Sequence, residues 1–584
     1  MKLGCELKKD KTGCTFKVWA PYAQDVRVIG DFNNWNPDAV FSQMERDNQG
    51  VWSADIPEAE AEQKYKFHIT GPEWNPVILD RPDPWARQME HSAGASIIKD
   101  PDFFNWTDTE WTPPSFEEMV IYELHVSTFI GKNDGLSYPG DFQQLLTKLK
   151  YIKNLGANAI ELLPVHEYAG DDYLGYAPVA FFPIEHSYGA AQGSYNDFKA
   201  LVNAAHAAGL AVIADLVLNH FTDRRGDDKW IWNYDGDTKY GKGGIYCSGH
   251  GTPWGPAPDW QEPKVREYAE ECCRYYLSEL HVDGLRFDAT QHITNKPGGW
   301  NALRNILWNL QQDTAYKKKI FIAENLPYEK GMVEYGNFDS AWWVEFHHSL
   351  EKALGGRQNS GSSVEEGING GNYSALHKRI VYTLGHDETR NGSQYLISDF
   401  GGRDNWDARA KRRLMSALQF FIPGIPMIWQ GEEFLQDGHF HDNYEQAVNW
   451  QYQTDPFGSQ MQKMYQDASA VRNSFTALRY GDLIWVHARD TNRVLAFIRK
   501  DPVNGQILLV VVNLGGTNWA PNHSYGIQTG EIKGQWMQVF CSQDAGYGGR
   551  DGTGNAYYEP WTQEDGKIYI NLPKWSVVVF LFKK

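Results

Sequence analysis

The chain has 584 residues and a formal net charge of −19. This excess of acidic groups disfavours nucleic acid and anionic membrane surfaces as partners, because phosphate-rich surfaces attract basic proteins, whereas a neutral ligand meets no such penalty. The chain also contains 23 Trp, 31 Tyr and 28 Phe, a content that suits large cores and also provides side chains that stack on sugar rings.

The N-terminal segment MKLGCELKKDKTGCTF has no apolar stretch of signal-peptide length, and no apolar run reaches the roughly 20 residues of a membrane span. The six cysteines form no CxxC pair and no metal-ligand spacing, and the adjacent Cys272 and Cys273 do not readily bridge each other. This pattern predicts free thiols in a reducing compartment. We therefore expect a cytoplasmic protein, and the sequence leaves its oligomeric state open.

Residues 1–105 are predicted to form an all-β sandwich. Short alternating runs such as TFKVWA and DVRVIG are separated by turn signals such as DFNNWNPD and DNQG. The following segment EWTPPSF is predicted to be a linker, because paired prolines break both helix and sheet.

Residues 106–468 alternate short β-rich runs with longer helical runs, the pattern of a parallel sheet built from βαβ units. The predicted strands are VIYELHV, NAIELLPV, LAVIADLVL, DGLRFD, KIFIAE, RIVYTLG and GIPMIWQG, with one more expected near FDSAWWVEF. Eight strands predict a closed (β/α)8 TIM barrel. In the helical run DFQQLLTKLKYIKNLG, the final glycine is a predicted C-cap.

Two further segments flank or interrupt this pattern. Residues at about 221–262 are polar and glycine-rich, and we expect a long loop without regular structure on the substrate face of the barrel. Residues 469–584 are again rich in strand patterns, such as VLAFIRK and QILLVVVNL, and are predicted to form a C-terminal all-β sandwich.

Polar residues end four of the predicted barrel strands, at the end where barrel active sites lie. Asp215, Asn219 and His220 end one run, Arg286 and Asp288 the next, Glu324 a third, and His386 and Asp387 a fourth. A carboxylate that ends a buried strand is costly unless it is paired or used. One such aspartate is explained by helix capping, but four successive strand ends are not.

Cleavage of a glycosidic bond needs one carboxylic acid to protonate the leaving oxygen and one carboxylate to attack the anomeric carbon or activate water. Asp288 and Glu324 are expected on neighbouring strands, where repulsion between carboxylates raises the pKa of the acid. Arg286 precedes Asp288 by two residues and therefore points to the same side of the strand, where its charge keeps a nucleophile ionised.

The segments DLVLNH, GLRFDAT, IAEN and GHDE resemble, in order and spacing, the four sequence regions of the α-amylase superfamily, glycoside hydrolase family 13. The resemblance implies a retaining mechanism with Asp288 as nucleophile, Glu324 as general acid/base and Asp387 as the third carboxylate. It implies that Arg286 is the partner of the nucleophile and that His220 and His386 surround the sugar. Residues with the remaining implied roles are Asp215 and Asn219, which support the site, and Tyr176, which either stacks under the sugar or packs in the core.

The segment FKVWAPYAQDVRVIGDFNNWNP resembles the starch-binding-like module of branching, debranching and trehalose-releasing enzymes, with Trp35 in its turn. The module either stacks on glucan or packs against the barrel as a spacer domain, and we expect it to pack against the barrel. YELHVSTF is similar to both branching enzymes and trehalohydrolases, whereas CSQDAGYGGRDGTGN is most similar to glycogen branching enzymes. Two features differ from branching enzymes: Asn325 follows Glu324, and the fourth region reads GHDETRNG. The segment FDSAWWVEFHHSL, with His347 and His348, is instead similar to trehalohydrolases.

These features favour a 1,4-α-glucan branching enzyme-like transglycosylase that forms α-1,6 branches and acts on glycogen, amylose or maltooligosaccharides. A hydrolase of the same superfamily, of the α-amylase, debranching or maltooligosyltrehalose trehalohydrolase type, is the alternative. A non-catalytic glucan-binding protein is the remote alternative. Carboxylates carry all of this chemistry, so we expect no cofactor and no catalytic metal.

Overall fold

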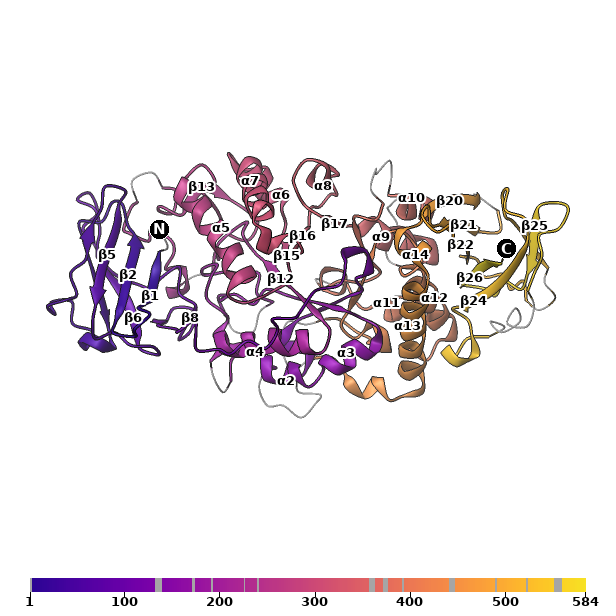
Figure 1. Ribbon diagram of the computed structural model, residues 1–584, viewed down its shortest axis with the longest axis horizontal. Coiled ribbons are helices and arrows are strands. Elements are labelled where there is room, and N and C mark those ends of the chain that lie inside the picture. Colours follow the sequence, from indigo (N-terminus) through magenta and orange to yellow (C-terminus); the bar gives the residue numbers. More distant parts are fainter. Residues whose placement is uncertain are drawn as a thin grey trace.

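Three domains follow one another along the long axis of the molecule, with the N-terminal domain at one end and the C-terminal domain at the other (Figure 1). The structure is a computed structural model. It describes residues 3–131, 139–170, 174–190, 193–224, 226–238, 241–356, 363–370, 376–390, 393–440, 447–488, 491–520, 522, 524–550 and 559–583.

The N-terminal domain is a β-sandwich, as predicted. One antiparallel sheet contains β1 (Gly4–Leu7), β2 (Cys14–Trp19), β5 (Val51–Ile56) and β4 (Glu45–Arg46). The other contains β3 (Asp25–Gly30), β6 (Lys64–Thr70), β9 (Ser96–Ile97) and β8 (Gln88–Met89), with β7 (Ile78–Arg81) paired to β6. Along β6, alternate residues Tyr65, Phe67 and Ile69 are buried, so the strand presents one face to the core.

The central domain is a closed barrel of eight parallel strands, which confirms the predicted fold. The strands are β10 (Ile121–Leu124), β11 (Ala159–Leu162), β12 (Ala211–Leu216), β15 (Gly284–Phe287), β16 (Ile320–Ala323), β17 (Ser340–Trp342), β18 (Arg379–Tyr382) and β19 (Ile425–Trp429). The eighth strand expected near FDSAWWVEF is β17. The longest helices around them are α4 (Ser194–Ala207), α5 (Pro263–Ser278), α7 (Gly299–Gln312), α9 (Val344–Leu354), α12 (Trp406–Leu418) and α13 (Pro456–Ser474).

Two predicted segments differ locally from expectation. The run DFQQLLTKLKYIKNLG forms two helices, α2 (Phe142–Leu146) and α3 (Leu149–Leu155), and Gly156 caps the second in the left-handed conformation with φ 102°. The segment at about 221–262 is not without regular structure, because β13 (Cys247–Gly251) and β14 (Pro256–Pro258) pair in it as an antiparallel hairpin. Its strands are rich in glycine and proline, which is why the strand pattern was hidden in the sequence.

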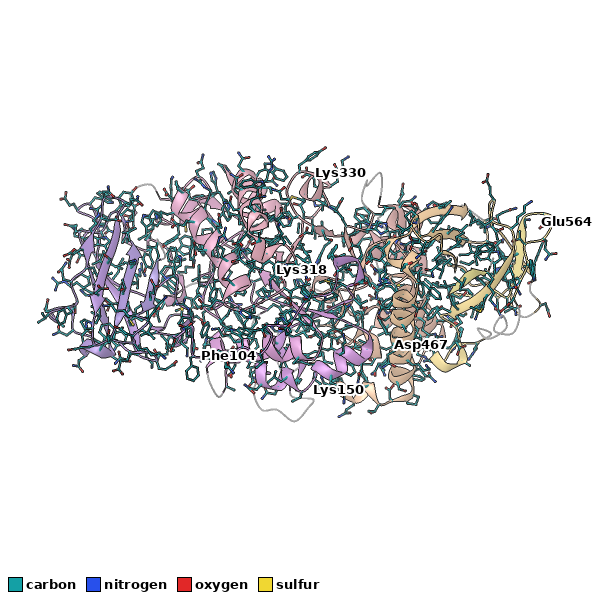
Figure 2. The ribbon with its side chains drawn as sticks, viewed as in Figure 1. Phe104, Lys150, Lys318, Lys330, Asp467 and Glu564 are labelled. Carbon is teal, nitrogen blue, oxygen red and sulfur yellow. The ribbon has the colours of Figure 1, made fainter. Side chains whose placement is uncertain are left out.

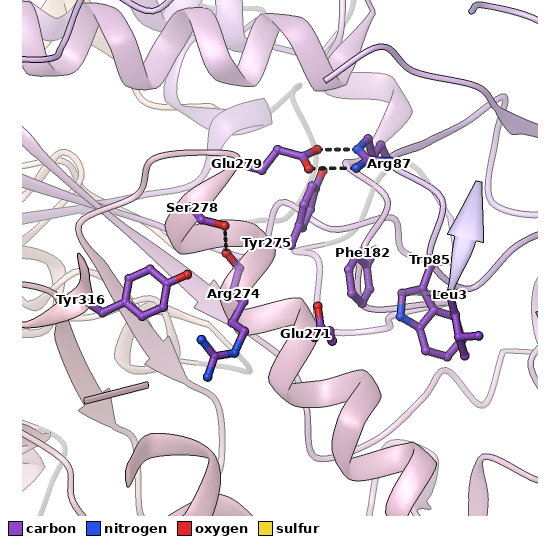
Figure 3. Close-up of a pocket in the computed structure, with 10 residues that line it drawn as sticks. All are labelled: Leu3, Trp85, Arg87, Phe182, Glu271, Arg274, Tyr275, Ser278, Glu279 and Tyr316. Atoms are coloured by element: carbon purple, nitrogen blue, oxygen red, sulfur yellow. Dashed lines mark hydrogen bonds and ion pairs between the residues drawn. The ribbon is translucent and has the colours of Figure 1, made fainter. Parts of the chain in front are cut away.

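The N-terminal domain packs against the barrel, as expected. At the junction, Arg87 forms a two-pronged ion pair with Glu279, which follows helix α5 (Figure 3). Tyr195 of α4 donates to the same carboxylate at 2.6 Å. The domain also contacts the 221–262 segment, where the Tyr22 amide donates to Asp235 at 3.0 Å. Trp35 takes no part in these contacts between the domains. It is 37% exposed, and its indole N–H donates to Asp31 in its own turn.

The C-terminal domain is also a β-sandwich, as predicted. Its main sheet has the order β20 (Asp482–His487), β21 (Val494–Lys500), β22 (Ile507–Asn513), β26 (Ser576–Lys583) and β24 (Gln535–Cys541), and β23 (Tyr525–Gln528) pairs with β25 (Lys567–Ile570). Helix α13 runs through the predicted domain limit at 468, so we propose that the C-terminal domain begins after this helix.

The surface and the core follow the composition. Charged side chains such as Lys150, Lys330 and Glu564 lie exposed on the outside, while apolar side chains fill all three domains (Figure 2). All six cysteines are free, and five of them are buried. Among the helices of the described residues, none has both the length and the apolar character that a membrane crossing requires.

A fully buried arginine joins the base of the barrel to its surroundings. Arg472 of α13 donates to four carbonyl oxygens, those of Glu117, Phe420, Gly424 and Leu478, at 3.0, 3.4, 2.9 and 3.1 Å. Burial lowers the pKa of its guanidinium to about 9, so the group is still charged at neutral pH. Three of these hydrogen bonds are buried and the one to Glu117 is partly buried, so the donors satisfy carbonyls with little access to water.

We predict that Arg472→Met destabilises the protein by on the order of 3 kcal/mol, because it leaves several buried carbonyls without donors. Thermal unfolding followed by circular dichroism measures this as a lower Tm. Lys463→Met on the same helix is the matched control, since Lys463 makes only an exposed pair with Asp467. Equal Tm values for the two variants would contradict the predicted role of Arg472.

Candidate active site

The sequence-predicted site residues meet at the carboxyl ends of the barrel strands. Asp215 lies in β12 beside Arg286 in β15, and Arg286 lies beside Ile322 in β16. Asp288 directly follows β15 and Glu324 directly follows β16. Because all eight strands are parallel, these side chains share one mouth of the barrel.

Arg286 is the centre of this cluster. Its Nη1 contacts Asp215 Oδ2 at 2.6 Å and Asp288 Oδ1 at 3.0 Å, and its Nη2 lies 2.8 Å from Glu324 Oε2. The guanidinium is fully buried and lies 4.5 Å from the centre of the Trp342 ring. One cation thus holds three carboxylates, and it brings Asp288 and Glu324 next to each other as the sequence predicted.

Backbone and amide donors fix the orientation of the two carboxylates. Asn219 donates to Asp288 Oδ2 at 2.6 Å and to the Asp288 carbonyl at 2.9 Å. The amide of Ala289 donates to Glu324 Oε2 at 2.8 Å. Ala289 adopts φ 40°, a left-handed conformation that is costly for a residue with a side chain. The turn after β15 therefore carries strain at the point where it directs a donor toward Glu324.

Burial and neighbouring charges shift the pKa of both carboxyl groups. Burial, together with the charges of Asp288 and Asp387, raises the pKa of Glu324 to about 7 against the opposing effect of Arg286. Burial also raises the pKa of Asp288, but Arg286 and the Asn219 donor oppose that rise. Near neutral pH, Glu324 can thus hold the proton that acid catalysis needs, while Arg286 and Asn219 favour the ionised form of Asp288.

Asp387 lies on the open side of the site. Its side chain is 50% exposed, and its charge contributes to the raised pKa values of Asp288 and Glu324. His386 lies between Asp387 Oδ1, at 3.6 Å, and Glu123 Oε1, at 2.7 Å. Although burial opposes it, these two carboxylates raise the pKa of His386 to about 10, so the imidazole is a cation at neutral pH.

Tyr176 lies beside His386, and together with His220 it lines a further side of the site. The Tyr176 ring stacks on His386 with 5.1 Å between ring centres, and its hydroxyl donates to Asp215 at 2.6 Å. Tyr176 is only partly buried, so it is not a pure core residue. His220 contacts Asn219 and, at 3.1 Å, the Tyr176 carbonyl, and burial lowers its pKa to about 4.

Four residues of the site region were not found from the sequence. Glu123 in β10 and Glu161 in β11 lie inside the barrel, and burial raises the pKa of both carboxyls. Trp342 in β17 supports Arg286, and Trp254 in the 221–262 segment is 41% exposed, 5.6 Å from the His220 ring. Glu123 and Glu161 could have been found from the sequence, because each is a glutamate inside an apolar strand run. Trp342 and Trp254 could not, because their sequence context is that of ordinary core or loop residues.

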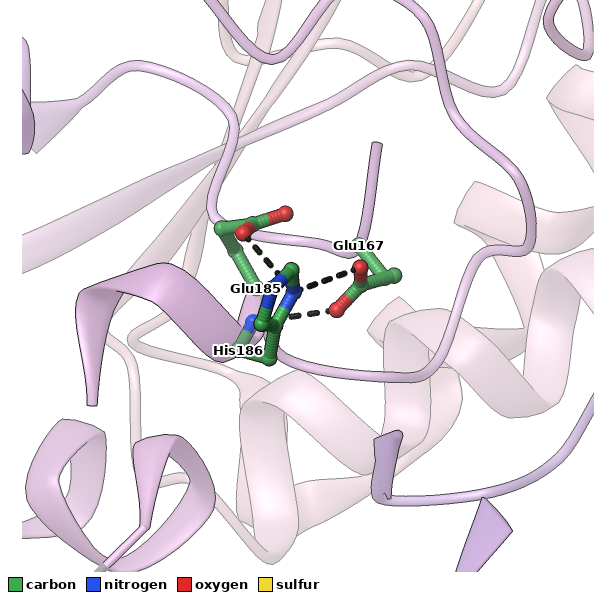
Figure 4. A group of neighbouring side chains, drawn as sticks. All are labelled: Glu167, Glu185 and His186. Carbon is green, nitrogen blue, oxygen red and sulfur yellow. Dashed lines mark hydrogen bonds and ion pairs between the residues drawn. The ribbon is translucent and has the colours of Figure 1, made fainter. Parts of the chain in front are cut away.

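A second polar cluster lies elsewhere on the barrel, where Glu167, Glu185 and His186 come within ligand distance of one another (Figure 4). His186 Nδ1 lies 2.9 Å from Glu167 and 3.2 Å from Glu185, and backbone amides donate to both carboxylates. Burial opposes the shift, but the two carboxylates raise the pKa of His186 to about 11. The imidazolium itself thus supplies the positive charge that these carboxylates need.

Three family models match the chain. Residues 2–86 match carbohydrate-binding module 48, the isoamylase N-terminal domain. Residues 100–231 match the α-amylase catalytic domain, and residues 485–583 match the α-amylase C-terminal all-β domain.

Relatives and solved structures agree with these matches. A 1,4-α-glucan branching enzyme of Xanthomonas euvesicatoria is 30% identical, over 92% of this chain and 75% of the relative. A malto-oligosyltrehalose trehalohydrolase of Saccharolobus solfataricus is 30% identical, over 74% of this chain and 76% of the relative. In fold, the chain is similar to a Salmonella typhimurium putative α-amylase, with a TM-score of 0.76, 20% identity, and coverage of 100% of this chain and 99% of that one. The protein belongs to the α-amylase superfamily, glycoside hydrolase family 13.

Proposed function

We propose that the protein is a retaining 1,4-α-glucan branching enzyme-like transglycosylase, with Asp288 as nucleophile and Glu324 as general acid/base. The observation that carries this proposal is the shared contact of both carboxylates with Arg286, combined with a pKa of about 7 for Glu324. The branching enzymes among its relatives support the transferase assignment, since the chain is similar to them over more than nine-tenths of its length.

In the first step, Glu324 donates its proton to the glycosidic oxygen while Asp288 attacks the anomeric carbon, which forms a glycosyl ester and releases the reducing-end fragment. In the second step, ionised Glu324 takes the proton of an acceptor hydroxyl, whose oxygen displaces Asp288. Transfer to a C6 hydroxyl of glucan forms an α-1,6 branch, and transfer to water would be hydrolysis.

The other site residues have supporting roles in this proposal. Arg286 keeps Asp288 ionised, and Asp215 and Asn219 orient Arg286 and Asp288 through the contacts described above. Asp387 accepts hydrogen bonds from sugar hydroxyls and favours a distorted ring. Tyr176 offers the partly exposed face of its ring to that sugar, with cationic His386 and neutral His220 beside it.

Trehalose release is the second candidate function. Similarity to a malto-oligosyltrehalose trehalohydrolase favours it, as does the pair His347 and His348, and Asn325 after Glu324 departs from the branching-enzyme pattern. Both reactions pass through the same glycosyl-enzyme ester, so they differ in the acceptor rather than in the carboxylates. An α-amylase-type or debranching hydrolysis differs in the same respect.

We also propose α-glucan as the partner molecule and the cytoplasm as the location. The match of residues 2–86 to a carbohydrate-binding module supports the partner. Five buried free thiols, and a sixth that is partly buried, support a reducing compartment.

Product analysis on amylose separates the candidates. Branching is expected to lower and shift the iodine colour with few new reducing ends. A parallel rise in reducing ends would indicate endo-hydrolysis, and trehalose released from glycosyltrehalose, detected by chromatography, would indicate a trehalohydrolase. Either of these outcomes would overturn the transferase proposal.

The pH profile tests the role of Glu324. We expect kcat/KM on a maltooligosaccharide to fall as the pH rises through about 7, because the acid must be protonated and its pKa is raised to about 7. With α-maltosyl fluoride, whose leaving group needs no proton, the first step should lose this alkaline limb. An alkaline limb that is identical for both substrates would argue against Glu324 as the acid.

A further inference from the structure

Glu123 is a buried carboxylate to which the proposed catalytic steps give no role. It lies in β10, opposite Glu161 of β11 and Trp429 of β19, and it is 1% exposed. Its Oε1 lies 2.7 Å from His386 Nδ1, while its Oε2 is buried and has no hydrogen-bond partner among the described residues. A buried charge is costly unless it is paired, and His386 supplies the pairing here.

His386 is held between two carboxylates. Its Nδ1 faces Glu123, and its Nε2 faces Asp387 Oδ1 at 3.6 Å, on the open side of the site. The Tyr176 ring stacks on the imidazole with 5.1 Å between ring centres, and the Trp342 ring lies 5.9 Å away. These contacts fix the plane of the imidazole, so Nε2 points toward the open side whenever Nδ1 is bound to Glu123.

Charges from several strands act on His386. Burial lowers its pKa, but Asp387 and Glu123 together raise it to about 10, in spite of the repulsion from Arg286. Glu123 contributes both its charge and a hydrogen bond from Nδ1, whereas Asp387 contributes its charge. The titratable and charged groups that face the ring are Glu123, Glu161, Tyr176, Asp215, Arg286 and Asp387.

The charge of the ring decides whether Nε2 is a donor. A neutral imidazole carries one proton, and the hydrogen bond made by one nitrogen sets which nitrogen keeps it. In a neutral ring that proton would stay on Nδ1, between the ring and Glu123, and Nε2 would carry none. An imidazolium carries both protons, so Nε2–H remains a donor on the side where Asp387 lies.

We propose that Glu123 is a positioning residue that acts through His386, because it holds the ring as an imidazolium whose Nε2–H donates to the sugar. The inference rests on the proposed function, since it needs a sugar between the three carboxylates. Glu123 is too deeply buried to reach that sugar itself. Its effect on the reaction therefore depends on the charge of His386 and should vary with pH, unlike a purely structural role.

The test compares Glu123→Gln with the wild type on α-maltosyl fluoride, whose leaving group needs no proton from Glu324. The glutamine oxygen still accepts the Nδ1–H hydrogen bond but carries no charge, so the pKa of His386 should fall toward its ordinary value of about 6.5. We expect the variant's kcat/KM to lie within about twofold of the wild-type value at pH 5.5, where the ring is still charged. At pH 8.5, where the charged donor is lost, it should be about tenfold lower.

Glu161→Gln is the matched control, since Glu161 is the buried glutamate opposite Glu123 on the next strand. Burial, followed by the charge of Glu123, raises the pKa of its carboxyl well above the usual value, so the change to glutamine removes no charge. Whatever its effect on the rate, the ratio of its kcat/KM to the wild-type value should be the same at both pH values.

A second measurement needs no change at position 123. In wild-type protein with ¹⁵N-labelled histidine, NMR should show the His386 ring protonated on both nitrogens at pH 8.5, with its signal identified by its absence from His386→Gln. A neutral ring at this pH, or a Glu123→Gln loss that is the same at both pH values, would overturn the role of Glu123 alone. A wild-type protein without turnover of α-maltosyl fluoride or any α-glucan would remove the proposed function, and this inference with it.

Discussion

The buried guanidinium of Arg286 is the constraint on which the site depends. Asp215, Asp288 and Glu324 are brought together by the convergence of parallel strands, and their negative charges would repel one another strongly in a buried site. Arg286 compensates these charges from inside the barrel and is itself held by the face of Trp342. Removal of one partner from such a buried network leaves an uncompensated charge, typically at a cost of about 3–5 kcal/mol.

The same arrangement places two similar residues, Asp288 and Glu324, in one buried site. Burial and two neighbouring carboxylates raise the pKa of both Asp288 and Glu324, and Arg286 opposes the rise at both. Asp288 also accepts a hydrogen bond from the Asn219 amide, and Glu324 accepts one from the backbone N–H of Ala289. The pKa of about 7 for Glu324 thus comes from its position in the barrel and not from its residue type. It lets one barrel mouth supply an acid and a nucleophile at neutral pH.

Sequence reasoning predicted the barrel and the positions of the site residues because both follow from local patterns. A polar residue directly after an apolar parallel strand must lie at the carboxyl-end mouth, so Asp288 and Glu324 could be placed together. Contacts between distant segments could not be predicted in this way. Glu123 pairs with His386 across 263 positions, and Trp342 supports Arg286 from another strand. The hairpin in the 221–262 segment was also hidden, since its glycines and prolines favour turns.

Trapping of the covalent intermediate identifies the nucleophile of this site. The Glu324→Gln variant should still react with α-maltosyl fluoride, because fluoride leaves without a proton, but should lack the base for the second step. We therefore expect a maltosyl adduct to accumulate. Mass spectrometry should find it on the peptide that contains Asp288. An adduct on a different residue, or fluoride release without any adduct at all, would contradict the assignment of Asp288 and Glu324.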